Sequence, residues 1–155
     1  MEGFKMNDLE AMYQYAVKVA DTLQASPVYD EHSDANDQAM VAYTFGVLNG
    51  YAQKNDFGAE EIQVVMVRLI SEFIGYPVDY AEALTQYIIS CTNKEENESI
   101  YIIIHKGLDQ YLDGGRVVDF QYDYSMILND IKAVVEPEPA PKRINMAARI
   151  NPNKQ

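Results

Sequence analysis

The sequence has one cysteine, Cys91, and no tryptophan among its 155 residues. A single cysteine excludes a disulfide within the chain and a zinc site built from cysteines, and it is typical of a reducing compartment. No stretch approaches the roughly 18 consecutive apolar residues that a membrane-spanning helix requires. The first ten residues, MEGFKMNDLE, lack the apolar segment of a signal peptide. We therefore expect a soluble, cytoplasmic protein that does not associate with membranes.

Basic residues are also scarce, with 12 Lys and Arg against 24 Asp and Glu. Residues 1–136 hold 8 of the basic and 23 of the acidic side chains, a net charge of −15. Such a body repels nucleic acid backbones and attracts basic proteins, although an acidic surface can also serve solubility alone. The proline-rich segment EPEPAP is typical of a linker. We predict an acidic helical domain over 1–136 and a basic, disordered tail over 137–155.

Apolar residues recur at helical spacing through most of the body, and no segment is convincing as a strand. We predict an all-α fold, a compact single-domain bundle of about six helices. The expected helices are at about 8–25, from Asp37 to the NDFG segment that begins at Asn55, and at about 59–74, 79–91, 98–113 and 119–136. The first of them would begin with a capping box formed by Asn7 and Glu10.

The segment ESIYIIIHKGLDQYLDGG (98–115) is ambiguous, because its run of isoleucine and tyrosine is also typical of a strand. Its apolar positions, however, recur at i, i+3, i+4, i+7, i+8 and i+11 from Ile100, which is longer than a usual strand. We therefore predict a helix. Because isoleucines surround its first half, we expect this helix to be buried on most sides. Gly107 would lie on its core face and allow another helix to approach closely.

Candidates for catalysis or metal binding are few. His105 and Asp109 lie four residues apart on the predicted helix, so they could form a general-base pair. No serine or cysteine is spaced as a nucleophile for them, and we favour a structural histidine that is hydrogen-bonded within a packed helix. His32 lies in an acidic segment that lacks the turn glycine and distant bidentate acid of a calcium loop. We predict no catalytic residue, no metal and no cofactor.

Acidic and tyrosine side chains remain as candidates for partner binding. The chain has twelve tyrosines, and tyrosine combined with acidic residues suits the binding of a basic protein. Tyrosines also fill the periphery of cores, so this pattern alone does not identify an interface. Two predicted loops are acidic, and in the segment DFQYDY we expect Gln121, Tyr122 and Asp123 to lie off the core face and to point outward. The candidate partner-binding residues are Asp30, Glu31, Asp34, Asp37, Glu95, Glu96, Glu98, Tyr122 and Asp123.

The central part of the chain resembles the immunity protein 48 family, which consists of small helical proteins encoded beside polymorphic toxins in bacteria. The resemblance covers about residues 60–131. It rests on a Cys-Thr-Asn turn, a nearby asparagine and the segment Ile-Ile-His-Lys-Gly-Leu-Asp-x-Tyr. The matching residues are Cys91, Thr92, Asn93, Asn97, Ile103, Ile104, His105, Lys106, Gly107, Leu108, Asp109 and Tyr111. A tryptophan that follows the tyrosine in the family is replaced here by the segment DGGRVVDF.

The resemblance implies a non-enzymatic protein that binds a cognate toxin and blocks its active site, and the acidic body is compatible with a basic toxin. We predict that the motif residues His105, Gly107, Asp109 and Tyr111 are structural, and that the chain is a monomer or weak dimer. The alternative is a helical adaptor or regulatory protein of a phage or mobile element. In that case the basic tail, through Lys142, Arg143 and Arg149, would contact an acidic partner. A small hydrolase using His105 is a third class.

Overall fold

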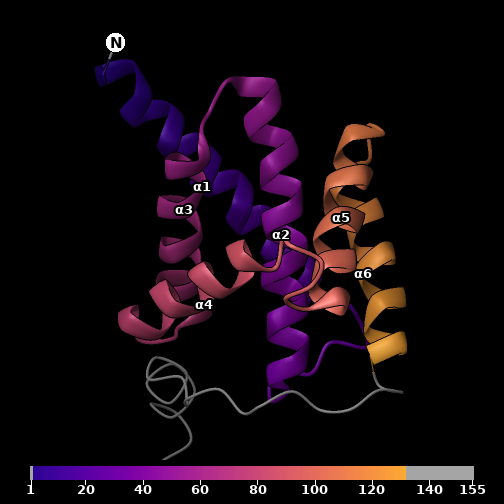
Figure 1. Ribbon diagram of the computed structural model, residues 1–155. Helices are drawn as coiled ribbons and strands as arrows, with labels where there is room; N and C mark the ends of the chain where they lie inside the picture. The colour runs from indigo at the N-terminus through magenta and orange to yellow at the C-terminus, as the bar shows by residue number, and fades with distance from the viewer. Residues whose placement is uncertain (1, 132–155) are drawn as a thin grey trace, which may run out of the picture.

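The computed structural model describes residues 2–131, with the side chains of residues 8–130, and this part of the chain folds as one bundle of helices (Figure 1). The elements are α1 (Glu2–Gln24), α2 (Asp34–Asn55), α3 (Ala59–Arg68), η1 (Leu69–Ile74), α4 (Val78–Ser90), α5 (Glu98–Leu112) and α6 (Val117–Ile131). Residues 2–131 contain no strand, so the all-α prediction is confirmed. The predicted tail over 137–155 lies outside the described residues.

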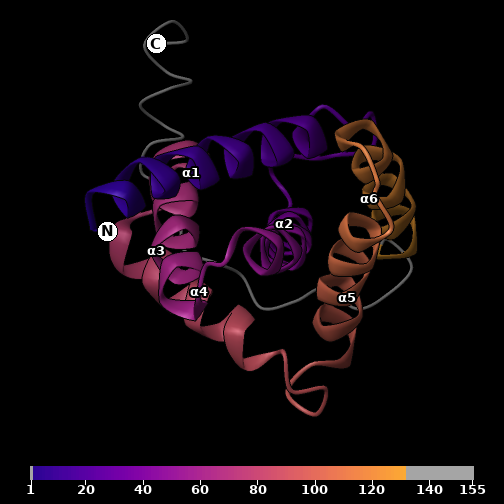
Figure 2. The same cartoon turned by 90° about the horizontal axis from the view of Figure 1, so that it is seen from above.

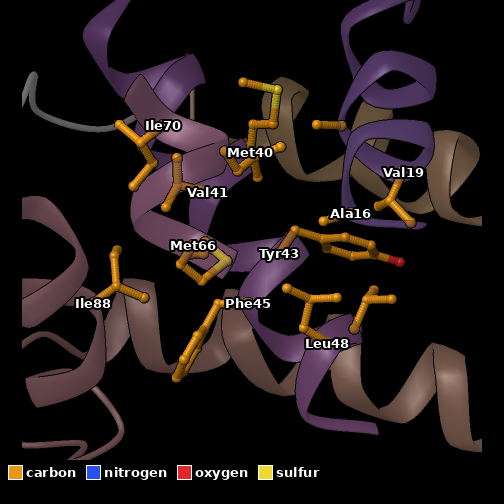
Figure 3. Packing of buried hydrophobic residues seen from close by; sticks show 14 of the residues in the cluster. Ala16, Val19, Met40, Val41, Tyr43, Phe45, Leu48, Met66, Ile70 and Ile88 are labelled. Carbon is orange, nitrogen blue, oxygen red and sulfur yellow. The ribbon is translucent and has the colours of Figure 1, made fainter. Parts of the chain in front are cut away.

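Helix α2 is the centre of the bundle. Viewed from above, it lies inside a ring formed by the other helices (Figure 2). Its side chains therefore reach the core in several directions: Val41 points toward Ile70 of η1, whereas Tyr43 points toward Val19 of α1 (Figure 3). Every residue of α2 from Ala39 to Leu48 is buried.

The prediction that α5 is buried on most sides is wrong. Ile100, Ile103 and Ile104 are buried in the core, but Ile102 is exposed, so α5 presents one face to the bundle. The surrounded helix is α2, whose apolar positions include many alanines. Small residues give little contrast between the faces of a helix. From the sequence, the helical spacing of Met40, Tyr43, Val47 and Tyr51 therefore predicts a single buried face for this segment.

Two glycines allow α2 and α5 to lie against each other. A Cβ atom on Gly46 of α2 would collide with the carbonyl oxygen of Ile104 on α5. A Cβ atom on Gly107 of α5 would collide with the carbonyl oxygen of Tyr43 on α2. Each glycine thus lies against the backbone of the opposite helix, and the close approach that we expected at Gly107 is present.

Helix boundaries differ most from the sequence prediction in α1, in α2 and over the segment 59–74. α6 begins at Val117, two residues before its predicted start, and its predicted end at 136 lies outside the described residues. α1 begins at Glu2, so Asn7 lies within the helix and does not form the expected capping box. The single helix expected at 59–74 is instead α3 followed by the π-helical segment η1. The π-helical spacing is seen where the Gly75 amide donates to the Ile70 carbonyl oxygen at 3.0 Å, and Gly75 ends the segment with a left-handed φ of 105°. Ser33 caps α2, which begins three residues earlier than predicted.

Candidate partner-binding surface

The connection between α1 and α2 carries the first set of predicted acidic residues. Asp30 and Glu31 are exposed, and Asp34 is half-buried in the first turn of α2. Hydrogen bonds fix the shape of this connection, because the amide of Asp30 donates to the side-chain oxygen of Asn36 at 2.7 Å. The amide of His32 donates to the Asp30 carboxylate at 2.9 Å. The connection therefore holds carboxylates toward solvent at the end of the bundle where α2 begins (Figure 1).

Asp37 does not belong to this surface, and its predicted exposure is wrong. The residue is 2% exposed, and its carboxylate accepts hydrogen bonds from the hydroxyls of Tyr29 at 2.6 Å and Tyr76 at 2.7 Å. Because α2 begins at Asp34, Asp37 lies one turn inside the helix and faces the core. Burial, together with the charges of Asp34 and Asp37, raises the pKa of nearby Tyr80 to about 12. Asp37 is a structural residue that joins three segments of the chain.

The connection between α4 and α5 carries the second acidic set, and here the prediction agrees with the exposure. Glu95, Glu96 and Glu98 are all exposed, and Glu98 is the first residue of α5. Lys94 is the basic residue of this connection, and its ammonium group lies 3.9 Å from the Glu98 carboxylate. The loop keeps a net negative charge despite this contact.

Two asparagines of the family motif determine the shape of that loop. Asn97 caps α5, where its side-chain oxygen accepts from the amide of Ile100 at 3.1 Å. Its side-chain nitrogen donates to the hydroxyl of Tyr87 at 2.8 Å, which ties the loop to α4. Asn93 accepts from the amide of Glu95 at 3.0 Å. An asparagine three residues before the first buried isoleucine was the sequence signal for this cap.

The motif residues on α5 do not form a catalytic pair. His105 is half-buried, with its ring centroid 4.3 Å from that of Tyr101, and Asp109 is exposed. Within residues 2–131 the His105 side chain forms neither a hydrogen bond to Asp109 nor the buried hydrogen bond that we favoured. Tyr111 instead joins an aromatic cluster, with its ring centroid 6.5 Å from that of Tyr51. Through Tyr111, the motif therefore contributes to the packing of α5 against α2.

An apolar stripe on α6 was only partly anticipated from the sequence. Val118, Tyr122 and Met126 recur at i, i+4 and i+8, and they are 60%, 72% and 49% exposed. We call these three residues the α6 stripe. The outward orientation of Tyr122 is as expected. Val118 and Met126 were not identified, although the same helical spacing would have placed them beside Tyr122.

Asp123 and Gln121, the other two α6 residues predicted to face outward, are turned partly inward. Asp123 is half-buried, and its carboxylate accepts from the hydroxyl of Tyr43 at 2.9 Å. Burial and the charge of Asp123 raise the pKa of Tyr43 well above its usual range. On the same helix, the side-chain amide of Gln121 donates to the carbonyl oxygen of Thr22 at 2.8 Å. These contacts attach α6 to α2 and α1, so its position is fixed on one side.

Within residues 2–131, no three His, Cys, Asp or Glu side chains are grouped so that they could hold a metal ion. Cys91 is buried, and burial raises the pKa of its thiol, which disfavours the reactive thiolate. Over the same residues, every helix is too short or too polar to cross a lipid bilayer.

Comparison with known proteins gives a family match. The sequence model for immunity protein 48 matches residues 10–132, which cover α2 to α6 and most of α1. The match therefore extends well before residue 60, where the resemblance seen in the sequence began. No curated protein and no solved structure matches the chain.

Proposed function

The chain belongs to the immunity protein 48 family, and from this membership we propose that it binds a cognate bacterial toxin and neutralises it by protein–protein contact. The single observation that carries this proposal is the family match over residues 10–132, since it includes nearly all of the helical bundle. In this proposal the chain covers the toxin's active site in the cytoplasm, as a monomer or weak dimer. It needs no catalytic residue and no cofactor.

We propose further that the toxin domain is basic. The exposed carboxylates of Asp30 and Glu31 extend from one connection, and those of Glu95, Glu96 and Glu98 extend from another. Charges at the rim of an interface act mainly on the association rate, and their effect weakens as salt screens them. These residues would therefore steer the toxin toward the bundle, and they would add little to the strength of the final complex.

Co-expression with the toxin domain encoded beside the gene tests the proposal. One variant replaces Asp30, Glu31 and Asp34 by their amides, and a second replaces Glu95, Glu96 and Glu98. Asp37 is left unchanged because it is buried. We expect at least one variant to associate with the toxin more slowly at low salt and to protect cells less, while both fold normally.

The matched control is Asp56→Asn with Glu60→Gln, which removes exposed carboxylates at the opposite end of α2 and should leave protection unchanged. Removal of residues 137–155 should also preserve protection, because the family match ends at residue 132 and a positive tail would repel a basic partner. If both acidic variants protect fully and the tail deletion is inactive, the toxin proposal fails. That result would favour the adaptor function, with Lys142, Arg143 and Arg149 as the contact residues.

A further inference from the structure

Helix α6 is covered by the bundle on one side only. It packs against α1, α2 and α5, and in the view from above it lies in the outer ring (Figure 2). The α6 stripe lies on its other side and extends over about 12 Å, since each helical residue advances about 1.5 Å. Apolar side chains scattered singly over a surface are ordinary. An exposed apolar residue on the same face of three consecutive helical turns, however, is not required by the fold.

The helix that carries the α6 stripe is acidic. α6 contains Asp119, Asp123 and Asp130, and no basic residue lies between Val117 and Ile131. Arg116, which precedes the helix, offsets part of this charge, because its guanidinium nitrogen lies 3.5 Å from the Asp119 carboxylate. The connection that carries Asp30 and Glu31 borders the same helix, because the hydroxyls of Ser26 and Ser125 lie 2.6 Å apart. An apolar strip with an acidic border is complementary to a partner surface that has an apolar centre and basic side chains around it.

Charge also selects among the possible occupants of this face. A second copy would bring two acid-bordered surfaces together, and such a contact is opposed by like-charge repulsion. The chain's own tail, residues 137–155, is basic, but it lies beyond the family match that ends at residue 132. A family function carried by residues 10–132 does not require that tail. A separate basic protein is therefore the occupant that fits both the acidic border of the α6 stripe and the extent of the family match.

We infer that the α6 stripe is the apolar anchor on which the basic toxin docks, with Tyr122 at its centre. This inference rests on the proposed function, and it assigns the main binding energy to a helix face separate from the acidic loops. Exposed tyrosines commonly provide such anchors, because a large rigid ring is buried at little entropic cost. The loops would then set the association rate, and the α6 stripe would set the dissociation rate.

The kinetic test measures binding of the full-length chain to the toxin domain encoded beside its gene. Tyr122→Ala and Val118→Ala should raise the dissociation rate, for Tyr122 by about tenfold or more, with the association rate nearly unchanged. Val64→Ala on α3 is the matched control, since Val64 is 58% exposed and Val118 is 60% exposed. All three variants should keep the wild-type melting temperature, because the replaced side chains lie largely in solvent.

A fluorescence test uses the lack of tryptophan in the chain. Tyr122→Trp places a single fluorophore at the proposed anchor, and its emission should shift to shorter wavelength when the toxin domain is added. Val64→Trp, the matched control, should show no shift, and it also corrects for tryptophans of the toxin. Deleting residues 137–155 from the Tyr122→Trp chain should leave its emission unchanged in the absence of toxin.

The outcomes separate this inference from the proposed function. If the wild-type chain does not bind the toxin domain, the proposed function and the inference both fail. If it binds and Tyr122→Ala dissociates at the wild-type rate, only the inference fails. A shift of the Tyr122→Trp emission on tail deletion would assign the α6 stripe to the tail. A wild-type dimer that Tyr122→Ala converts to a monomer, with toxin affinity unchanged, would assign the stripe to a second copy.

Discussion

Gly107→Ala should destabilise the protein, although alanine is the better helix former. In a solvent-exposed helix this substitution stabilises by about 1 kcal/mol. Here a Cβ atom on Gly107 would collide with the carbonyl oxygen of Tyr43 and lie 3.2 Å from the amide nitrogen of Val47. Both obstacles are backbone atoms of the central helix α2, so no side-chain rotation can relieve the clash. α5 would have to move away from α2.

The magnitude follows from two opposing terms. Overpacking a core typically costs about 1–3 kcal/mol, and a clash with backbone belongs at the upper end of that range. After the gain in helix propensity is subtracted, we expect the free energy of unfolding to fall by about 2 kcal/mol. For a chain of this length that corresponds to a melting temperature lower by roughly 4–8 °C.

Urea unfolding followed by circular dichroism measures this loss, and a double-mutant cycle with Gly46→Ala tests its cause. One displacement of α5 would relieve both clashes, so the double variant should lose less than the sum of the single losses. Gly58→Ala is the control, because its Cβ atom would meet only the flexible carboxylate of Glu61, at 3.2 Å. A Gly107→Ala protein as stable as the wild type would refute the backbone contact between α2 and α5.

Three further predictions concern buried or half-buried polar side chains. Asp37→Ala should lower the free energy of unfolding by about 3 kcal/mol, because two tyrosine hydroxyls lose their carboxylate acceptor. Asp30→Ala, the control, should be nearly neutral. Equal urea midpoints for the two variants would contradict this prediction. The raised pKa of Tyr80 favours its neutral form in the fold, so its stabilising effect is complete below about pH 10 and is lost as pH rises through about 12. The denaturant midpoint of unfolding should therefore be lower at about pH 11.5 than at about pH 9, and equal midpoints would count against this account. His105→Gln should lower the free energy of unfolding by less than about 1 kcal/mol, since it removes only a half-buried ring contact with Tyr101. The variant should preserve protection against the toxin. Loss of protection at an unchanged melting temperature would assign His105 to the interface.

The helical character of α5 could be predicted from the sequence because its apolar spacing continues over three turns. The central position of α2 could not, because its burial depends on which helices surround it. Its alanines and Gly46 are compatible with either a surface or an interior. The π-helical geometry of η1 was also missed, since periodicity identifies a helix without specifying its hydrogen-bond spacing.

The candidate surface was predictable where side chains are simply exposed, as for Glu95, Glu96 and Tyr122. The expectation that Asp37 is exposed was wrong for a different reason. One of its partners, Tyr76, lies 39 residues away in the sequence, so only the folded chain reveals that this carboxylate is buried. An acidic composition therefore predicts that most residues of a segment are exposed, whereas tertiary hydrogen bonds determine whether a particular carboxylate is buried.

The burial of Cys91 turns the single cysteine into a natural probe of local opening. Its thiol lies at the end of α4, where the acidic loop begins, and it is inaccessible in the closed fold. A thiol-modifying reagent can therefore label the chain only when this junction opens. Because the chain has no other cysteine, the labelling rate reports the opening equilibrium of one site without any substitution. Comparing that rate with and without the proposed toxin partner would test whether binding at the acidic loop reduces the opening of this junction.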